Sequence, residues 1–507
     1  MNQSLKRIFS LIFSVSVVQL LLAQVAINED NFPDKLFRDH VSTNYDLDKN
    51  DTLSTTEIEK VDTIDVSLIS IGNKDNIITD LTGIEYFTAL KKLGFSYHAL
   101  TSIDISKNTE LTELRCDRNK LTSLDVTKNT ALRVLHCDLN KIRNLDVSNN
   151  TDLEILWCGT NSLITLDVSN NLALTELDCC YNLLFDLDVT NNIALKELCC
   201  GSNYLSFLDV SKNIELERLI CWKNYIKSID LPNSTALRSI SCFSNKLNSL
   251  DVTKNTELKT LYCYWNSLTS LDVSNNTALI DFECNGNQLT TLDVTNNTKL
   301  EVLNCSENQL TSLNLSNNTL LKRLYSWSNN LSSLDLSNNL NLDPTRSWFV
   351  DCSDNSYTAN IDKTFIFNLS SLPGEFDHTR MSIKSGNAVD KDGYLNIDES
   401  IGEDTIKVVY EYIANKDYTF EYTLNLVPME VNEVPLVNSV DAYPFYPNPA
   451  KSSVRVLSTG YYKIYDGSGV LLQSGMVEKN NEINISNLSS GVYLFDFEGR
   501  KEKLIVK

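Results

Sequence analysis

Apolar residues recur along most of the chain with a period of 21 residues. The repeating unit reads LxxLxCxxNxLxxLDVxxNxx, and we count positions from its first leucine. Ten cysteines, from Cys116 to Cys305, occupy position six at this same spacing, so they mark a repeat rather than a disulfide framework. We name each coil by its first leucine, and the coils begin at Leu90, Leu111, Leu132, Leu153, Leu174, Leu195, Leu216, Leu237, Leu258, Leu279, Leu300 and Leu321.

A coil of this kind has an apolar face that it cannot bury alone, so neighbouring coils must stack. The pattern predicts one short parallel strand per coil, with leucine packed on leucine at about 4.8 Å spacing. The cysteine points inward between two leucines and behaves as a small hydrophobe. We expect reduced structural thiols, because neighbouring Cβ vectors point the same way and do not face each other. Zinc binding is the alternative, and it requires thiolates that converge on one point.

Two polar positions also repeat. Asparagine at position nine, from Asn119 to Asn329, is expected to satisfy the backbone where each strand turns away. Asp125 and its equivalents at position fifteen are expected to cap tight turns through Asx-type bonds. Calcium between stacked aspartates is the alternative, although the repeat lacks the glycine-rich pattern of calcium solenoids.

This repeat is the leucine-rich-repeat signature, and it most resembles bacterial internalin-like proteins in which cysteine replaces a core leucine. The resemblance covers residues 64–357. It implies an α/β-type solenoid, a right-handed leucine-rich-repeat horseshoe of parallel strands. We expect an EF-hand-like N-terminal cap before it, and a small β domain and a C-terminal β-sandwich after it.

Variable positions two, three, five, seven and eight are expected to face solvent on the concave side, where function should lie. Aromatic residues gather there in the later coils, and such a patch is typical of a binding surface. Flat rings also suit stacking on sugars, while the alternative is that the rings only pack on one another. The predicted binding residues are Trp157, Tyr181, Trp222, Phe243, Tyr262, Tyr264, Trp265, Tyr325 and Trp327.

Two cysteines fall outside position six. Cys180 and Cys199 lie at positions seven and five of adjacent coils, and both are expected to face outward. Strand spacing and rise place their Cα atoms about 8 Å apart, beyond comfortable disulfide reach. A strained bridge remains the alternative.

Residues 24–63 are expected to cap the first coil, with a short amphipathic helix at residues 34–44. The segment that follows matches the oxygen-ligand spacing of an EF-hand loop, and its predicted calcium ligands are Asp46, Asp48, Asn50, Thr52 and Glu57. Asp51 replaces the glycine that the motif uses for a positive φ, and this should weaken affinity. We expect a structural calcium ion, and the alternative is a helix–turn–helix cap with solvated acids. Similar segments precede the repeats in the proteins that this chain resembles.

The two ends of the chain carry export signals. Residues 1–23 have a positive start and an apolar stretch typical of a signal peptide, with a membrane anchor as the alternative. Residues 358–427 are expected to form a small β domain, with strands at 365–369, 406–410 and 418–424, followed by a linker at 428–442. Residues 443–507, from Tyr446-Pro-Asn-Pro449 to the terminal Leu504-Ile-Val-Lys507, resemble the type IX secretion sorting domain. That resemblance implies the type IX machinery as a partner, export across the outer membrane, and frequent attachment to surface lipopolysaccharide.

Charge and motifs limit the function. A net charge of −22 makes nucleic acid and anionic lipid poor partners. No catalytic motif is recognisable, so we do not expect an enzyme. We expect a secreted, surface-displayed protein for adhesion or recognition, which binds an extracellular protein or glycan through its concave face. The alternative is a structural spacer or matrix component of the cell envelope.

Overall fold

The computed structural model describes residues 24–68, 76–343, 345, 350–361, 364–374, 376–398, 405–428, 445–446, 452–456, 459–466, 470–478, 481–497 and 500–506. The chain divides into two compact units, residues 1–429 and 430–507. The predicted signal peptide and residues 429–442 of the predicted linker lie outside the described residues.

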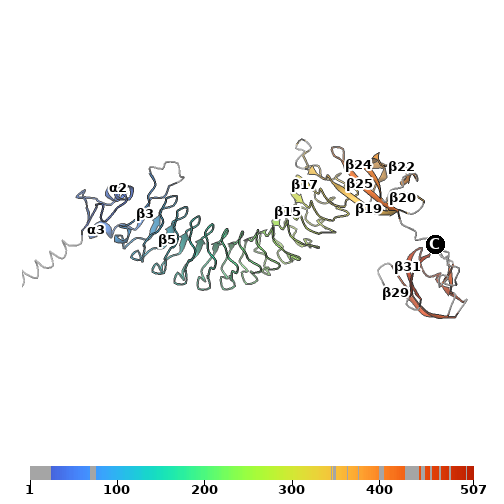
Figure 1. The fold of residues 1–507 in the computed structure, drawn as a ribbon, viewed down its shortest axis with the longest axis horizontal. Helices are drawn as coiled ribbons and strands as arrows, with labels where there is room; N and C mark the ends of the chain where they lie inside the picture. Colours follow the sequence, from blue (N-terminus) through green and yellow to red (C-terminus); the bar gives the residue numbers. More distant parts are fainter. Residues whose placement is uncertain are drawn as a thin grey trace, which may run out of the picture. The chain divides into compact units, whose positions relative to one another are not determined.

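The repeats of the first unit form a solenoid that follows an arc, with the strands along its inner side (Figure 1). One parallel sheet of 14 strands runs through it, and each of the twelve strands in the coils from Leu90 to Leu321 covers positions three to five of its coil. In spatial order the strands are β3 (Thr63–Asp65), β4 (Lys92–Gly94), β5 (Glu113–Arg115), β6 (Val134–His136), β7 (Ile155–Trp157), β8 (Glu176–Asp178), β9 (Glu197–Cys199), β11 (Arg218–Ile220), β13 (Ser239–Ser241), β14 (Thr260–Tyr262), β15 (Asp281–Glu283), β16 (Val302–Asn304), β17 (Arg323–Tyr325) and β18 (Val350–Asp351). The predicted parallel solenoid is therefore confirmed. A second, two-stranded parallel pair, β10 (Leu208–Asp209) with β12 (Ile229–Asp230), lies outside this sheet.

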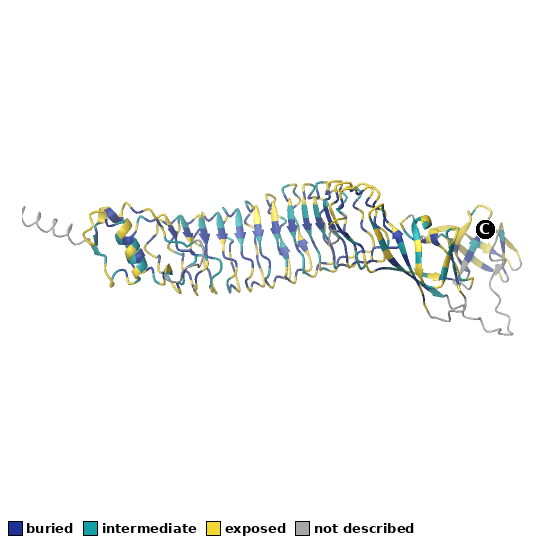
Figure 2. Cartoon of the chain, turned by 90° about the horizontal axis from the view of Figure 1, so that it is seen from above, coloured by how far each residue is buried: buried dark blue, intermediate teal, exposed yellow. Residues whose placement is uncertain are grey.

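The core of each coil contains the residues that the repeat predicts. In the Leu111 coil, Leu111, Leu114, Cys116, Leu121 and Val126 are all fully buried. Eleven buried cysteines are free thiols, and burial raises their pKa above the ordinary value. The prediction of reduced structural thiols is thus confirmed for this cysteine ladder. In Figure 2 the buried strand residues run along the middle of the solenoid, with exposed residues along both edges.

Two asparagine rows, rather than one, hold neighbouring coils together. At position nine, the Asn119 side chain donates to the Phe95 carbonyl at 2.8 Å and accepts from the Leu100 amide at 3.1 Å. This confirms the predicted backbone role. At position nineteen, the fully buried Asn129 donates to the carbonyls of Ile105 and Asn108. Each coil is therefore tied to its predecessor at two corners.

Two turn features complete the coil. Asp125 accepts hydrogen bonds from the amide and the hydroxyl of Thr127, which is the Asx-type cap expected at position fifteen. Position eight has a positive φ, for example 56° at Arg118 and 63° at Gly286. The chain therefore turns sharply directly after each strand, and the side chains at positions seven and eight are placed by this turn.

The N-terminal segment covers the first coil. Helix α2 (Lys35–Asn44) begins after Asp34, whose carboxylate accepts from the amides of residues 36 and 37. Strand β1 (Val25–Ala26) pairs antiparallel with β2 (Thr52–Leu53), and the short helix α3 (Thr55–Ile58) follows. Phe32, Phe37 and Val41 are fully buried and belong to the same hydrophobic core as the repeats.

The last coil is covered by a small β domain. One sheet has the order β19 (Asn355–Ile361), β25 (Thr419–Pro428), β24 (Ile406–Ile413) and β21 (Met381–Ser385), and a second has the order β20 (Ile366–Asn368), β23 (Tyr394–Ile397) and β22 (Ala388–Lys391). The Tyr410 hydroxyl donates to the Ser332 carbonyl at 2.6 Å, and the Leu336 amide donates to the Ala414 carbonyl at 3.1 Å. These bonds join the domain to the solenoid.

The second unit has its own hydrophobic core, which includes Val454, Ile464, Phe495 and Leu504. Its strands form two antiparallel sheets. One contains β26 (Phe445–Tyr446), β27 (Ser453–Val456) and β30 (Glu482–Asn484), and the other contains β29 (Leu471–Val477), β28 (Gly460–Tyr465), β31 (Gly491–Phe497) and β32 (Arg500–Val506).

Candidate functional site

Five of the predicted aromatic residues form one continuous group, which we call the concave stripe: Tyr181, Trp222, Phe243, Tyr264 and Trp265. Their rings make contact in that order, with centroids 5.2, 5.6, 4.3 and 5.4 Å apart. Trp222, Phe243 and Tyr264 all occupy position seven of consecutive coils. The coil spacing is close to the separation of stacked rings, so the repeat itself aligns them.

The three central rings lie face to face. The Trp222 and Phe243 planes differ by 9°, and those of Phe243 and Tyr264 differ by 8°. Each of these rings is half-buried, whereas Tyr181 and Trp265 at the two ends are 52% and 55% exposed. The stripe therefore presents mainly ring edges, with free ring surface at its ends.

Two glycines make room for the tryptophans. A Cβ atom at Gly201 would lie 2.9 Å from a Trp222 ring carbon, and one at Gly286 would lie 2.3 Å from a Trp265 ring carbon. Both contacts are too close for a side chain, and Gly286 also has a φ of +63°. Glycine at these positions is therefore required by the rings that cover it.

The other four predicted residues lie outside this group. Trp157 stacks on His136 with centroids 4.1 Å apart. Tyr262 donates its hydroxyl hydrogen to Asp281 at 2.9 Å. Tyr325 and Trp327 belong to the Leu321 coil, three coils beyond Trp265.

Acidic groups lie beside the aromatic residues. Burial, followed by the nearby Asp117 carboxylate, raises the pKa of Asp138 to about 6. Burial also raises the pKa of Asp178, and that of Glu283, where Asp281 adds to the effect. The concave positions thus hold partly buried carboxylates whose charged form is disfavoured.

The expectation that the two cysteines outside position six lie too far apart for a disulfide was wrong. Cys180 and Cys199 form a disulfide, and their Cα atoms are 5.6 Å apart rather than about 8 Å. A separation of about 8 Å requires straight strands, but strand β8 ends at Asp178 and the chain then turns. The slanted bond from the Cys179 amide to the Cys199 carbonyl, 2.8 Å long, also brings position seven of one coil toward position five of the next.

The predicted calcium loop brings three carboxylates together. One oxygen from each of Asp46, Asp48 and Glu57 lies within 4.8 Å of the others. Asp46 accepts from the amides of Asn50 and Asp51, and Asp51 has the positive φ, 59°, that the motif requires at this position. The backbone amide of Ser54 is the main cause of the lowered pKa of Glu57. These carboxylate oxygens fit a hard cation.

The Asn50 and Thr52 side chains bond within the same loop. The Asn50 amide nitrogen donates to Asp48 at 2.8 Å, and its oxygen accepts from the Thr52 amide at 2.9 Å. All five predicted ligand residues therefore lie in one hydrogen-bonded segment, which includes β2 and the start of α3.

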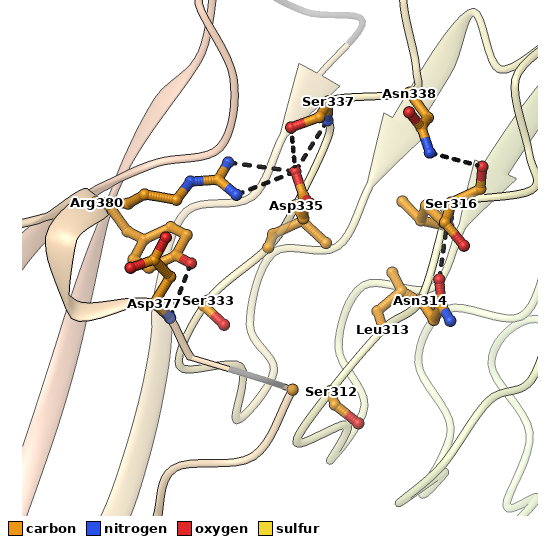
Figure 3. Close-up of a pocket in the computed structure, with 14 residues that line it drawn as sticks. Ser312, Leu313, Asn314, Ser316, Ser333, Asp335, Ser337, Asn338, Asp377 and Arg380 are labelled. Carbon is orange, nitrogen blue, oxygen red and sulfur yellow. Dashed lines mark hydrogen bonds and ion pairs between the residues drawn. The ribbon is translucent and has the colours of Figure 1, made fainter. Parts of the chain in front are cut away.

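A polar cleft of about 530 Å³ lies between the last coils and the β domain (Figure 3). Arg380 forms an ion pair with Asp335 at 3.2 Å, and its guanidinium also donates to the carbonyls of Ile413 and Ala414. The bonds of Arg380 therefore help to hold the domain on the solenoid.

A second exposed apolar surface was missed by the sequence analysis. Phe185, Tyr204 and Tyr225 lie on one flank of the solenoid and are 63%, 42% and 47% exposed. They occupy positions ten and twelve, where most coils carry polar residues. That departure from the repeat was visible in the sequence, but our prediction considered only the concave positions.

Comparisons with known proteins agree with this architecture. Residues 444–507 match the family model described as the secretion system C-terminal sorting domain. This is the sorting domain of type IX secretion, so the protein is exported to the cell surface or the extracellular space. Among the residues that the structure describes, no helix has both the length and the apolar character needed to cross a membrane.

The rest of the chain is similar to internalins. The solved functional domain of internalin J from Listeria monocytogenes, described as including a cysteine ladder, is 30% identical, with a TM-score of 0.59. That match covers 80% of this chain and 99% of the solved one. An internalin F structure from the same species has the same fold at 22% identity, with a TM-score of 0.54, covering 63% of this chain and 96% of that one.

Full-length internalin J extends well beyond the shared region. In the sequence comparison it is 40% identical over 80 residues, which is 16% of this chain and only 8% of internalin J. The long structural match and the cysteine ladder nonetheless define the first unit, and the sorting domain defines the second. The chain belongs to the internalin-like leucine-rich-repeat proteins of the cysteine-ladder type.

Proposed function

We propose that the protein is a surface-displayed recognition protein that binds an extracellular protein or glycan, in adhesion or a related contact, through its concave stripe. The observation that carries the proposal is the continuous row of five aromatic rings from Tyr181 to Trp265. Clustered exposed aromatic residues dominate the binding energy of many interfaces. A spacer or matrix component would gain nothing from them, because other coils fold with serine at the same positions.

The ring geometry favours a protein as the ligand. A sugar that stacks on an aromatic residue needs a free ring face, but Phe243 is covered on both faces by Trp222 and Tyr264. Ring edges and the half-exposed ends of the stripe suit apolar protein side chains. The nearby carboxylates Asp178 and Glu283 add a polar rim of the kind that surrounds protein interfaces.

The test is binding of the full chain to arrays of extracellular proteins and glycans, in the presence of calcium. The stripe variant would carry Trp222→Ser, Phe243→Ser, Tyr264→Ser and Trp265→Ser. Serine already occupies position seven at Ser306 and position eight at Ser328, so the coils should still fold. Loss of binding by at least roughly thirtyfold, with unchanged circular dichroism, is expected if the rings are hot spots. Binding that the variant retains would move the ligand site elsewhere.

We also propose that the loop of Asp46, Asp48, Asn50, Thr52 and Glu57 holds a structural calcium ion. The support is the convergence of three carboxylates and the positive φ of Asp51. Calcium would fix the loop that joins α2 to α3, and so stabilise the segment that covers the first coil. Attachment of the exported chain to the outer-membrane surface is a further proposal, which rests on the sorting domain alone.

A further inference from the structure

The flank that follows each strand contains an aromatic surface which the fold does not require. Positions ten, twelve and thirteen of every coil lie there, around the buried leucine or isoleucine at position eleven. In the coils from Leu258 to Leu321 these positions hold only serine, threonine, glutamine and asparagine. In the coils from Leu153 to Leu216 they include Ile164, Leu183, Phe185, Tyr204, Phe207 and Tyr225, which we call the aromatic flank.

The later coils act as an internal control for this difference. They form the same strands in the same parallel sheet, so polar residues at these positions are fully compatible with the fold. The six residues of the aromatic flank are between 39% and 63% exposed. Large side chains exposed to this extent amount to an apolar patch on the order of 500 Å², at the upper end for a monomeric protein. These exposed apolar side chains lower solubility and the fold does not need them, which indicates that they form an interaction surface.

The rings of the aromatic flank form one row. Phe185 and Tyr204 have centroids 5.3 Å apart and planes 19° apart, and Tyr204 and Tyr225 have centroids 6.1 Å apart and planes 16° apart. The Lys246 ammonium lies 5.0 Å from the Tyr225 ring centre. Both faces of Tyr204 are therefore covered by neighbouring rings, and Tyr225 has a ring on one side and a cation close by. Ring edges and tyrosine hydroxyls remain exposed, which suits protein side chains better than a stacked sugar.

At positions ten, twelve and thirteen most charged residues are basic, although the whole chain carries a net charge of −22. In the coils from Leu111 to Leu237, the three flank positions contain five basic residues and a single acidic one, Asp186. Lys141 and Arg143 line one shallow hollow together with Thr122 and Ser162, which shows that neighbouring coils form a common surface. The basic residues lie on both sides of the aromatic flank along the solenoid, and they are Lys120, Lys141, Arg143, Lys227 and Lys246.

We propose that the aromatic flank is a second interaction surface, distinct from the concave stripe, which binds a protein with acidic residues around an apolar patch. An aromatic centre with a charged rim is the usual anatomy of a protein interface. Lysine and arginine at the rim select an acidic partner and speed its association. A second copy of the chain is disfavoured by mutual repulsion between two chains of net charge −22.

The test selects ligands from a random 15-residue peptide library displayed on phage, with the full chain as bait. The flank variant carries Phe185→Thr, Tyr204→Gln, Phe207→Thr and Tyr225→Gln, which are residues that later coils hold at the same positions. A charge variant carries Lys141→Gln and Lys246→Gln. The stripe variant described above is the matched control, and circular dichroism and thermal unfolding establish that all variants fold.

The expected peptides are rich in aspartate and glutamate next to apolar residues. Their affinity should fall roughly thirtyfold in the flank variant, because it removes four interface anchors. In the charge variant it should fall several-fold with a weaker dependence on salt, and in the stripe variant it should not change. Heparin and phosphatidylglycerol vesicles are tested in parallel, and sedimentation equilibrium measures self-association.

Three results would overturn the proposal. One is that no selected peptide depends on the flank, or that the dependent peptides are not acidic. Another is flank-dependent binding to heparin or vesicles alone, which would indicate an anionic glycan or a membrane. The third is self-association that the flank variant abolishes while no peptide binds. Failure of this proposal would leave the concave stripe untouched, because the two variants share no residue.

Discussion

Replacement of Asn182 by alanine should destabilise the solenoid far more than its single side chain suggests. Asn182 is 4% exposed and lies at position nine of the Leu174 coil. Its amide nitrogen donates to the carbonyls of Cys158 and Cys179, both at 3.1 Å, and its oxygen accepts from the Leu163 amide at 2.9 Å. One side chain thus makes hydrogen bonds to the backbone of two coils.

The cost can be worked out from the partners that remain. The Cys158 carbonyl keeps a bond from Asn161, and the Cys179 carbonyl keeps one from Asn203. The Leu163 amide loses its acceptor and stays buried, which costs about 1–3 kcal/mol. The lost donor bonds and the small cavity add about 1 kcal/mol, so the total should be about 2–4 kcal/mol. Asn182→Asp should be worse, because a buried carboxylate would face carbonyl oxygens.

The matched control is Asn170→Ala in the adjacent Leu153 coil. Asn170 is exposed and makes one bond, to the Ser148 carbonyl at 3.2 Å, so its loss should cost under about 0.5 kcal/mol. Urea unfolding of the full chain compares the two variants. Hydrogen exchange at Leu163 gives a local measure, with acceleration of about thirtyfold or more in Asn182→Ala. Equal stability of the two variants, or unchanged exchange at Leu163, would refute this account.

Three further predictions concern other parts of the first unit. Mass spectrometry without reductant should find Cys180 joined to Cys199. The Cys199→Ser variant should lower the free energy of unfolding by up to about 3 kcal/mol, because the bridge no longer restricts the loop in the unfolded chain. Recovery of Cys180 and Cys199 as alkylated thiols from the native protein would contradict the bridge. Because the folded pKa of Asp138 is raised to about 6, its charged form destabilises the fold at neutral pH, and this effect disappears as the pH falls through 6 toward 4. The Asp138→Asn variant should therefore be more stable than the parent by about 1–2 kcal/mol at pH 8, after allowance for the partial exposure of Asp138, and equal to it at pH 4. Denaturant titrations that show the same difference at both pH values would contradict the raised pKa of Asp138. Millimolar calcium should raise the melting temperature of the full chain but not that of the Glu57→Gln variant. The Glu59→Gln variant, which changes an exposed glutamate outside the proposed ligands, is the control and should respond like the parent. An equal calcium effect on all three proteins would place the ion elsewhere.

Much of the fold follows from periodicity. A 21-residue repeat with inward leucine, valine and cysteine can bury its apolar side only by stacking, so the parallel strands and the row of free thiols were predictable from the sequence. The loop that we propose for calcium could also be identified as a candidate, because its acidic residues are close together in sequence. The β domain was predicted with shorter strands than β24 and β25 have, since strand ends depend on pairing rather than on local pattern.

The sequence by itself determined the period, the core of each coil and the export signal, because each depends on residues that recur or lie close together in the chain. Only the tertiary structure decided how neighbouring coils align. The turn that follows each strand and the slant of the parallel bonds brought Cys180 within bridging distance of Cys199. The same alignment stacked Trp222 on Phe243 and Phe185 on Tyr204, and it thereby decided that these surfaces offer ring edges rather than faces. The alignment of side chains on neighbouring coils depends on backbone geometry between residues about twenty positions apart, which the sequence pattern does not encode.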